Sequence, residues 1–218
     1  MKLSILILAA GNSSRLNYPK QLVEFEGQTL IERITETALM ISDEILIVLG
    51  GNSELIIPKL ERFNDTISTI LNPDWQQGMG TSIRIGVEKL AEKSDSILIL
   101  LSDQPFISTV LLQNMIQIFE KSSNHIVSCV YNQQLGVPML FDKSVFPELM
   151  KLSGDRGAKS FLHLYKDNIS TIDFPEGVID IDTFEDLEKL KNIDSEIFTN
   201  KRAENFFSAL SKSFNKFS

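Results

Sequence analysis

The chain has 218 residues, of which 43% are hydrophobic and 23% are charged, and its formal net charge is −8. This length suits one large domain, and the composition supplies a packed core and disfavours global disorder. The acidic balance disfavours general binding to nucleic acid or to anionic membranes. Cys129 is the single cysteine, which excludes an internal disulfide framework and a cysteine-rich zinc site.

The N-terminal apolar stretch is too short to span a bilayer and runs directly into "GNSSR". It is therefore expected to be a strand and not a signal peptide. The expected location of the protein is a reducing cytoplasm.

Short apolar runs alternate along the chain with longer amphipathic segments, which predicts a three-layer α/β fold. Several of the apolar runs show no alternation, which is typical of strands covered on both faces in a mostly parallel sheet. Strands are predicted at 3–8, 44–49, 67–71, 96–101, 125–131 and 169–174, and helices at 28–41, 53–63, 80–93, 108–121, 155–166 and 183–193.

The chain divides into a domain over 1–193 and a Phe-rich tail over 194–218. In the tail, Phe207, Leu210 and Phe214 fall on one helical stripe. This pattern predicts an amphipathic helix packed on the domain, with a dimer contact or a partner-docking helix as the alternative.

Ligands of such sheets bind at the carboxyl ends of the strands, so the loops that follow the strands carry the functional hypotheses. The first of these loops is "LAAGNSSRLNYPKQL" (8–22). Gly11 permits a tight turn, and Asn12 and Ser13 offer N–H and polar groups to an anion. Arg15 and Lys20 add two charges that suit phosphate oxygens. The alternative is an ordinary polar loop with two solvated cations.

The loop "LSDQPFIS" (101–108) places Asp103 at the end of an apolar strand. A carboxylate there suits Mg²⁺, which prefers one or two carboxylates together with substrate phosphates. The alternative is a turn or helix cap. Further along, Asp180 and Asp182 alternate with isoleucine, and we expect Asp182 to point across the sheet toward Asp103, while Thr183 opens the next helix as its cap.

Two more loops contain glycines beside polar residues. In "NPDWQQGMGTSIRIG" (72–86), Gly78 and Gly80 would let a base or ribose approach the backbone, unless Thr81 or Ser82 only caps the helix. Trp75 is either a stacking platform or part of the core. In "GDRGAK" (154–159), two cations are available to a second anion, and a solvated turn is the alternative.

Together these segments resemble the molybdenum-cofactor cytidylyltransferase type of nucleotidyltransferase. "LAAGNSSRLNYPKQL" is similar to the signature LAAG-x-S-x-R followed by P-K-x-L, and "GMGTSIRIG", "LSDQPFIS", "GVPMLF", "GDRGAK" and "DIDTFEDL" match later blocks in order. The resemblance spans residues 3–190. It departs from the family pattern at Asn17, at Phe184 and in "YNQQL", which lacks an Arg-containing stretch common in the family.

The resemblance implies a Rossmann-like nucleotidyltransferase fold with a mostly parallel, mixed sheet and an active site at the strand carboxyl ends. It implies Mg²⁺ as cofactor, an NTP (CTP favoured) as donor, and a phosphorylated acceptor, molybdopterin. A transient contact with a molybdoenzyme or its chaperone is a further expectation. A sugar or polyol phosphate acceptor, or a non-catalytic nucleotide-binding module, remains open as an alternative.

The expected site residues fall into four groups. The catalytic residues are Lys20, Arg15 and Asp103, and the metal ligands are Asp103 and Asp182. The nucleotide-binding residues are Leu8, Ala9, Ala10, Gly11, Asn12, Ser13, Arg15, Lys20, Gly78, Gly80, Thr81, Ser82 and Asp103. The acceptor-binding residues are Gln104, Gly136, Pro138, Arg156 and Lys159.

Overall fold

The computed structural model describes residues 1–13, 16, 18–155, 157–179, 181, 185, 186, 188–190 and 192. Several expectations lie outside the described residues: those for Arg15, Arg156, Asp180, Asp182 and Thr183, and the tail over 194–218. In the described part of the chain, no helix combines the length and the apolar character that crossing a membrane requires.

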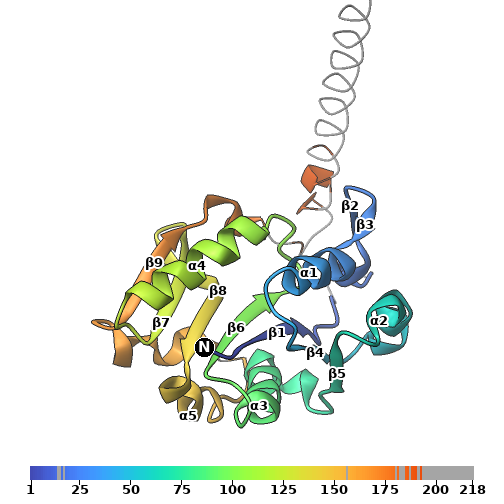
Figure 1. The fold of residues 1–218 in the computed structure, drawn as a ribbon. Helices are drawn as coiled ribbons and strands as arrows, with labels where there is room; N and C mark the ends of the chain where they lie inside the picture. Colours follow the sequence, from blue (N-terminus) through green and yellow to red (C-terminus); the bar gives the residue numbers. More distant parts are fainter. Residues whose placement is uncertain are drawn as a thin grey trace, which may run out of the picture.

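A seven-stranded sheet forms the centre of the domain, with the strand order β5-β4-β1-β6-β8-β7-β9 (Figure 1). β8 pairs antiparallel with both β6 and β7, and the other pairs in this sheet are parallel. The mostly parallel, mixed α/β sheet predicted from the sequence is therefore confirmed. The strands are β1 (Leu3–Ala9), β4 (Ile45–Leu49), β5 (Ser68–Leu71), β6 (Ser96–Leu101), β7 (Ile126–Tyr131), β8 (Gln134–Asp142) and β9 (Ile169–Asp173), with a small hairpin of β2 (Glu24–Phe25) and β3 (Gln28–Thr29) beside them.

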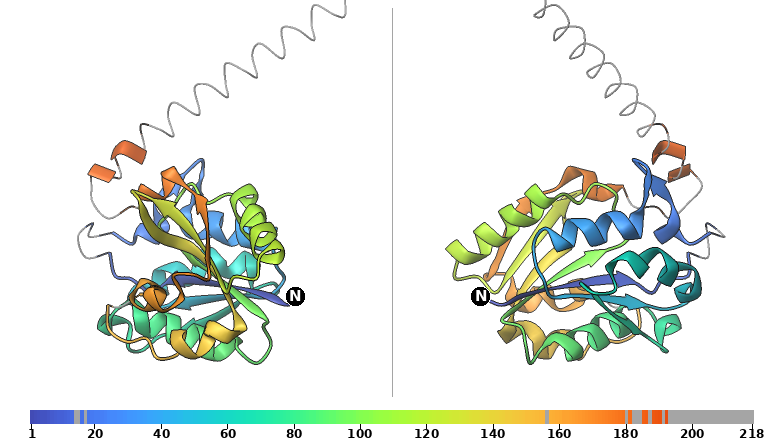
Figure 2. Two further views of the ribbon diagram at one scale, coloured as in Figure 1. Left: turned by 90° about the vertical axis from the view of Figure 1, so that its left-hand side faces the viewer. Right: turned by 45° about the vertical axis from the view of Figure 1, so that its right-hand side comes forward.

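Helices cover both faces of this sheet (Figure 1 and Figure 2). α1 (Leu30–Leu39) and α4 (Thr109–Lys121) lie on one face, and α3 (Met79–Leu90) and α5 (Phe146–Leu149) lie on the other. α2 (Ser53–Leu60) follows β4 near the β5 edge. The short 3₁₀ helices are η1 (Lys20–Leu22), η2 (Glu61–Phe63), η3 (Trp75–Gln77), η4 (Lys143–Val145), η5 (Ala158–Tyr165) and η6 (Pro175–Val178).

Alternate residues of β1 enter two different hydrophobic cores. Ile5 and Ile7 pack on the face of α1 and α4, whereas Leu6 and Leu8 pack on the face of α3. All four are buried, and each such side chain contributes about 1.5–3 kcal/mol when removed from water. The uninterrupted apolar run of this strand is thus explained by burial on both sides.

The first helix begins later than predicted because its N-terminus is capped. Thr29 and Glu32 form a reciprocal capping box, in which the Thr29 hydroxyl accepts from the Glu32 amide and the Glu32 carboxylate accepts from the Thr29 amide. Residues 28 and 29 belong instead to β3. The Thr29 and Glu32 side chains thus accept hydrogen bonds from backbone N–H groups that have no partner within the helix.

Two further elements differ from the prediction. β8 is a strand where none was predicted, and it contains Pro138, which cannot donate to the ladder. The β7 residues Ser128 and Cys129 pair with Met139 and Gly136, so Val137 and Pro138 fall within an irregularity of the ladder. The helix predicted at 155–166 is the 3₁₀ helix η5, which begins at Ala158.

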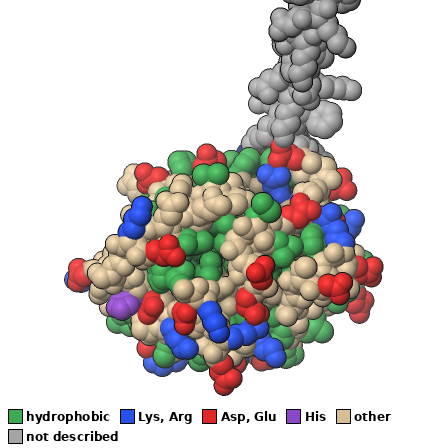
Figure 3. Space-filling view, viewed as in Figure 1, with side chains coloured by type: hydrophobic (Ala, Val, Ile, Leu, Met, Phe, Trp, Pro, Cys, Tyr) green, Lys and Arg blue, Asp and Glu red, His purple; other side chains and the backbone are tan. Residues whose placement is uncertain are grey.

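The strand order indicates where a sheet of this kind would bind a ligand. From β1 the chain moves by way of α1 to β4 and β5, and then returns by way of α3 to β6 on the other side of β1. The loops after β1 and β6 therefore diverge at a topological switch point, where open α/β sheets bind ligands. Acidic and basic side chains are interspersed over the face drawn in Figure 3, around a hydrophobic hollow.

Candidate nucleotide-binding and transfer site

The loop after β1 is held against the strand end by a buried glutamine. The Gln21 side-chain amide donates to the carbonyl of Ala9 at 3.1 Å and to that of Gly11 at 3.0 Å. Ser13 adopts a φ of 52°, and its hydroxyl accepts from the Lys20 amide at 3.0 Å. These contacts fold the loop back on itself and bring η1, with Lys20, to the mouth of β1.

Lys20 and Asp103 form an ion pair across the switch point. Lys20 comes from η1, and Asp103 is the second residue after β6, so the two loops after neighbouring strands meet here. Both side chains are largely buried, with exposed fractions of 18% and 10%. The attraction between the two charges is therefore screened less than that of a surface pair.

One oxygen of Asp103 is buried without a hydrogen-bond partner in the described part of the chain. Oδ2 contacts Lys20, whereas Oδ1 has no such partner. A buried unsatisfied carboxylate oxygen is costly and calls for an additional ligand. Among the described residues no group of three or more His, Cys, Asp or Glu side chains forms a metal site by itself.

Ile181, the residue before the predicted second carboxylate, lies beside Asp103. The Ile181 amide donates to the Asp103 carbonyl at 3.3 Å, and the Gln104 side chain donates to the Gly177 carbonyl at 3.2 Å. Ile181 is fully buried. Asp182 itself lies outside the described residues, but its neighbour in the chain is thus fixed at the Asp103 loop.

A polar cavity of about 290 Å³ opens beside the loop after β1. Ser13 and Asn12 line it on the loop side, and Trp75 and Ser82 line it from η3 and α3. The Trp75 side chain also packs against Gly50 and Gly51, where an added Cβ would lie 2.8 Å from its atoms. The full lining is Leu8, Ala10, Gly11, Asn12, Ser13, Trp75, Gln76, Gly78, Met79, Ser82 and Asp155.

The N-terminus of α3 is built from glycine and hydroxyl groups. Gly78 has a φ of 112°, which favours glycine. Thr81 is buried, and its hydroxyl lies within hydrogen-bonding distance of the Gly78 and Asp74 carbonyls. The side-chain amide of Asn72 donates to the hydroxyls of Thr81 and Ser82. Thr81 thus shapes the loop, and Ser82 faces the polar cavity.

The turn at 154–155 is docked on this helix end. The Gly80 amide donates to the Gly154 carbonyl at 2.9 Å. A Cβ added to Gly78 would lie 2.4 Å from Asp155 Oδ1 and 2.5 Å from the Gly154 carbonyl carbon. The start of α3 and the turn at 154–155, which are far apart in the sequence, therefore pack against each other and form one wall.

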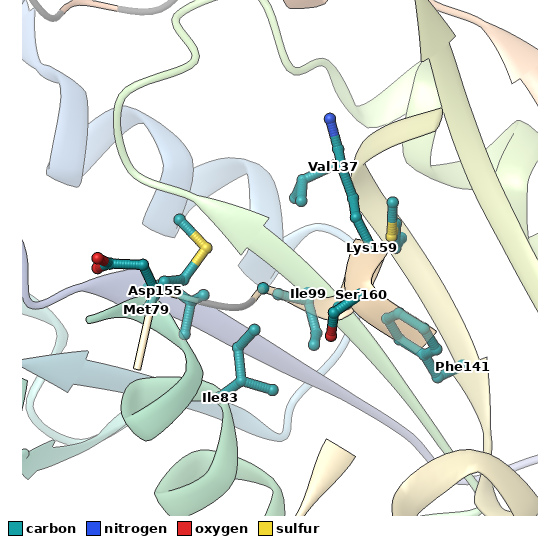
Figure 4. Close-up of a pocket in the computed structure, with 12 residues that line it drawn as sticks. Met79, Ile83, Ile99, Val137, Phe141, Asp155, Lys159 and Ser160 are labelled. Atoms are coloured by element: carbon teal, nitrogen blue, oxygen red, sulfur yellow. The ribbon is translucent and has the colours of Figure 1, made fainter. Parts of the chain in front are cut away.

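An apolar cavity of about 400 Å³ lies on the other side of that wall (Figure 4). Aliphatic and aromatic side chains from α3, β6 and β8 form most of its surface, and Asp155 and Lys159 stand at different sides of it. The lining is Leu8, Met79, Ile83, Ile99, Val137, Met139, Phe141, Asp155, Gly157, Ala158, Lys159 and Ser160. Leu8, Met79 and Asp155 line both cavities.

The structure separates the predicted acceptor-binding residues. Lys159 lines the apolar cavity, whereas Gly136 and Pro138 are buried and line neither cavity. A Cβ on Gly136 would lie 2.2 Å from the Tyr131 ring, which accounts for that glycine by packing. Gln104 is buried and holds Gly177.

The predicted nucleotide-binding residues separate in the same way. Leu8, Ala10, Gly11, Asn12, Ser13, Gly78 and Ser82 line the polar cavity. Ala9, Gly80 and Thr81 support it from behind through hydrogen bonds of their backbone or hydroxyl groups. Met79, Val137 and Asp155 were not predicted, since their roles depend on contacts between distant loops that leave no local pattern.

Comparison with known proteins places the chain in a family. Residues 5–169 match the model of the MobA-like NTP transferase domain. The chain is 30% identical over 197 residues to the nicotine blue oxidoreductase of Paenarthrobacter nicotinovorans, covering 85% of this chain and 94% of that protein. It is 28% identical to a probable molybdenum cofactor guanylyltransferase of Methanosarcina mazei, covering 73% and 71%.

Solved structures agree with the sequence relatives. Rv0371c from Mycobacterium tuberculosis H37Rv superposes with a TM-score of 0.75 at 26% identity, covering 87% of this chain and 96% of that chain. A nucleotidyl transferase from Methanothermobacter thermautotroptrophicus shares the fold, with a TM-score of 0.75 at 17% identity over 89% of this chain and 98% of that chain. With a family match that spans most of the sheet, the loop after β1 and both cavities, the chain belongs to the MobA-like NTP transferase domain family of nucleotidyltransferases.

Proposed function

We propose that the protein is a Mg²⁺-dependent nucleotidyltransferase that moves CMP from CTP onto the phosphate of molybdopterin and releases pyrophosphate. The observation that carries this proposal is the largely buried Lys20–Asp103 ion pair at the switch point, which is linked to the polar cavity through the hydrogen bond from the Lys20 amide to Ser13, a lining residue. Two opposite charges at that place suit a site that must hold both a polyphosphate and a divalent cation.

The donor set of the site fits Mg²⁺. Asp103 supplies a buried oxygen without a hydrogen-bond partner among the described residues, and Asp182 follows Ile181, whose amide bonds to the Asp103 loop. Mg²⁺ accepts one or two carboxylates and takes its remaining ligands from water and substrate phosphates. We assign Asp103 and Asp182 to the metal, which would neutralise charge on the triphosphate when bound. A related structure is that of Rv0371c complexed with manganese.

The reaction needs positioning and charge neutralisation more than a general base. An oxygen of the acceptor phosphate forms the new bond to the α-phosphorus, the bond from that phosphorus to the β-phosphate bridging oxygen breaks, and pyrophosphate leaves with the electron pair. The nucleophile is already anionic. Lys20 and Arg15 are assigned to the triphosphate oxygens, which they orient for in-line attack and whose charge they offset.

The two cavities suit a donor and an acceptor on either side of one wall. The polar cavity offers backbone groups, Asn12 and Ser13 to a nucleotide, and the apolar cavity offers aliphatic and aromatic surface to a ring. Sugar and polyol phosphates present hydroxyl groups that apolar walls cannot satisfy. This difference, and the relatives named as molybdenum cofactor guanylyltransferases, favour molybdopterin over a sugar or polyol phosphate acceptor. A transient contact with a molybdoenzyme or its chaperone would then receive the product.

The test is a panel of turnover measurements on the full chain. CTP, GTP, ATP and UTP are each supplied with Mg²⁺ and either molybdopterin, a sugar 1-phosphate or a polyol phosphate, and pyrophosphate release is followed. We expect release with CTP and molybdopterin. Release with another acceptor and none with molybdopterin would overturn the acceptor assignment, and nucleotide binding without release in any combination would identify a non-catalytic module.

A further inference from the structure

Asp155 is the charged side chain that the two cavities share. It is the one ionisable side chain among the residues described as lining the polar cavity, and it also lines the apolar cavity next to Met79 (Figure 4). Its position is set by the docking of the 154–155 turn on α3, through the Gly80–Gly154 hydrogen bond and the close approach to Gly78.

A carboxylate is an unexpected group in a site for polyphosphates, because its charge repels them. Asp155 is exposed, and within the described part of the chain it makes no hydrogen bond or ion pair. Its two oxygens can only accept hydrogen bonds when the group is ionised. A ligand that suits it must therefore bring N–H or O–H donors to this end of the cavity.

The apolar cavity restricts that ligand further. Ile83, Ile99 and Val137 come from three different elements and present aliphatic surface to the same space. Its volume of about 400 Å³ lies in the range of small-molecule sites. A flat heteroaromatic ring buries its faces against such walls and leaves its polar edge for the single acidic group.

We propose that the apolar cavity receives the pterin ring of the acceptor and that Asp155 accepts two parallel hydrogen bonds from its 2-amino-4-oxopyrimidine edge. This inference rests on the proposed function for the identity of the acceptor. The edge in question carries an N–H beside an NH₂ group, and paired donors of this kind match the two oxygens of a carboxylate. Asp155 is a specificity residue in this assignment and takes no part in the bond-making step.

The experiment compares ligands that differ at the 2-position. Free pterin and lumazine, in which a carbonyl replaces the 2-amino group, are titrated into the full chain and binding is followed by ligand fluorescence. Hydrogen bonds to charged groups predict that the wild-type protein prefers pterin by about tenfold or more. Asp155→Asn, which is nearly isosteric but no longer ionised, should remove this preference.

Two controls separate recognition from damage to the fold. Asp167→Asn changes an exposed carboxylate in the turn before β9, outside the lining of both cavities, and should keep the wild-type preference. Val137→Trp adds bulk to the apolar cavity and should weaken binding of both pterin and lumazine. Each variant is first checked by thermal unfolding and by CTP binding.

A guanine base carries the same edge, so GTP and ITP, which lacks the 2-amino group, form the second arm. If Asp155→Asn removes a preference for GTP over ITP and leaves the pterin preference intact, Asp155 acts on the donor base and the acceptor assignment is overturned. Equal binding of pterin and lumazine to the wild-type protein also overturns it. Pterin preference without turnover would defeat the proposed function alone, and turnover without pterin preference would defeat this inference alone.

Discussion

The Ile181 amide donates a hydrogen bond to the Asp103 carbonyl, although the two residues are distant in the sequence. This bond fixes the start of the segment 181–190 against the loop after β6. Leu190 and Ile181 are buried in a small cluster with Leu16 and Phe25, which belong to the loop after β1 and to the hairpin. Three segments of the proposed site are thereby packed as one unit.

The first prediction concerns the ion pair. Lys20→Ala or Asp103→Ala should lower turnover by about two orders of magnitude or more, because each removes a charge that acts on the reacting phosphates. Pyrophosphate release measures this. Lys93→Ala, which removes a surface ion pair with Glu44, is the matched control and should retain activity. Near-wild-type release by either site variant would contradict the mechanism.

The second prediction concerns the metal. Removing divalent cations with a chelator should abolish pyrophosphate release, and adding Mg²⁺ or Mn²⁺ should restore it. Asp182→Asn should raise the Mg²⁺ concentration needed for half-maximal release, since one of two carboxylate ligands is lost. An unchanged metal requirement in that variant would remove Asp182 from the metal site.

The third prediction compares two glycines. Gly78→Ala should destabilise the protein by about 1–3 kcal/mol and weaken nucleotide binding, because φ is 112° and the added Cβ would collide with Gly154 and Asp155. A Cβ on Gly11 meets nothing within 4 Å, so Gly11→Ala should leave the unfolding temperature nearly unchanged. Thermal unfolding checks both, and equal stability of the two variants would refute the docking of the turn.

The fourth prediction concerns pH. Burial acts to raise the pKa of Glu32, but hydrogen bonds from the Thr29 side chain and backbone, together with the charges of Arg62 and Lys59, outweigh it and hold this pKa below the ordinary 4.5. A depressed pKa in the folded state contributes stability that is present above the unfolded value and is lost as pH falls through the folded value.

Glu32→Gln can keep the capping hydrogen bonds but cannot titrate. Its free energy of unfolding should therefore fall less than that of the wild-type protein when pH drops from neutral to below 4.5. Denaturant unfolding at the two pH values measures the difference. Parallel losses in both proteins would show that the Glu32 carboxyl contributes no pH-dependent stability.

The fifth prediction concerns the single thiol. Burial raises the pKa of Cys129 to about 12, from an ordinary value of 9.0. The thiolate fraction is then about a thousandfold lower than for an unperturbed thiol, and only the thiolate is nucleophilic. The native protein should resist disulfide-exchange reagents at neutral pH and react after denaturation. Rapid reaction of the native protein would contradict the burial of Cys129 beneath α4.

Much of the fold was predictable because several strands have a clear sequence pattern. β1, β4 and β6 are uninterrupted apolar runs, and burial on both faces of a parallel sheet explains them. The meeting of Lys20 and Asp103 was also predictable, since loops after neighbouring parallel strands share one edge. In each case a local sequence pattern, combined with a general rule of sheet geometry, was sufficient for the prediction.

The parts of the fold and site that were not predicted depend on contacts between distant segments, which leave no local pattern in the sequence. β8 was not predicted, and the structure accommodates its Pro138 at an irregularity of the ladder. The sequence predicts only a turn with two cations at 154–159, and the docking of that turn on Gly78 and Gly80 is what brings Asp155 to the site. Val137 lines the apolar cavity, whereas its neighbours Gly136 and Pro138 do not.

Met79 and Asp155 make up a partition that two ligands would touch from opposite sides. A side-chain conformation imposed on this partition by a ligand in one cavity also alters the shape of the other. Thermodynamic linkage requires such an effect to be equal in both directions, so a donor that tightens acceptor binding is itself held more tightly by the acceptor. If donor and acceptor occupy the two cavities as proposed, the residues that line both cavities couple the two binding sites, in addition to the direct contact between the reacting phosphates.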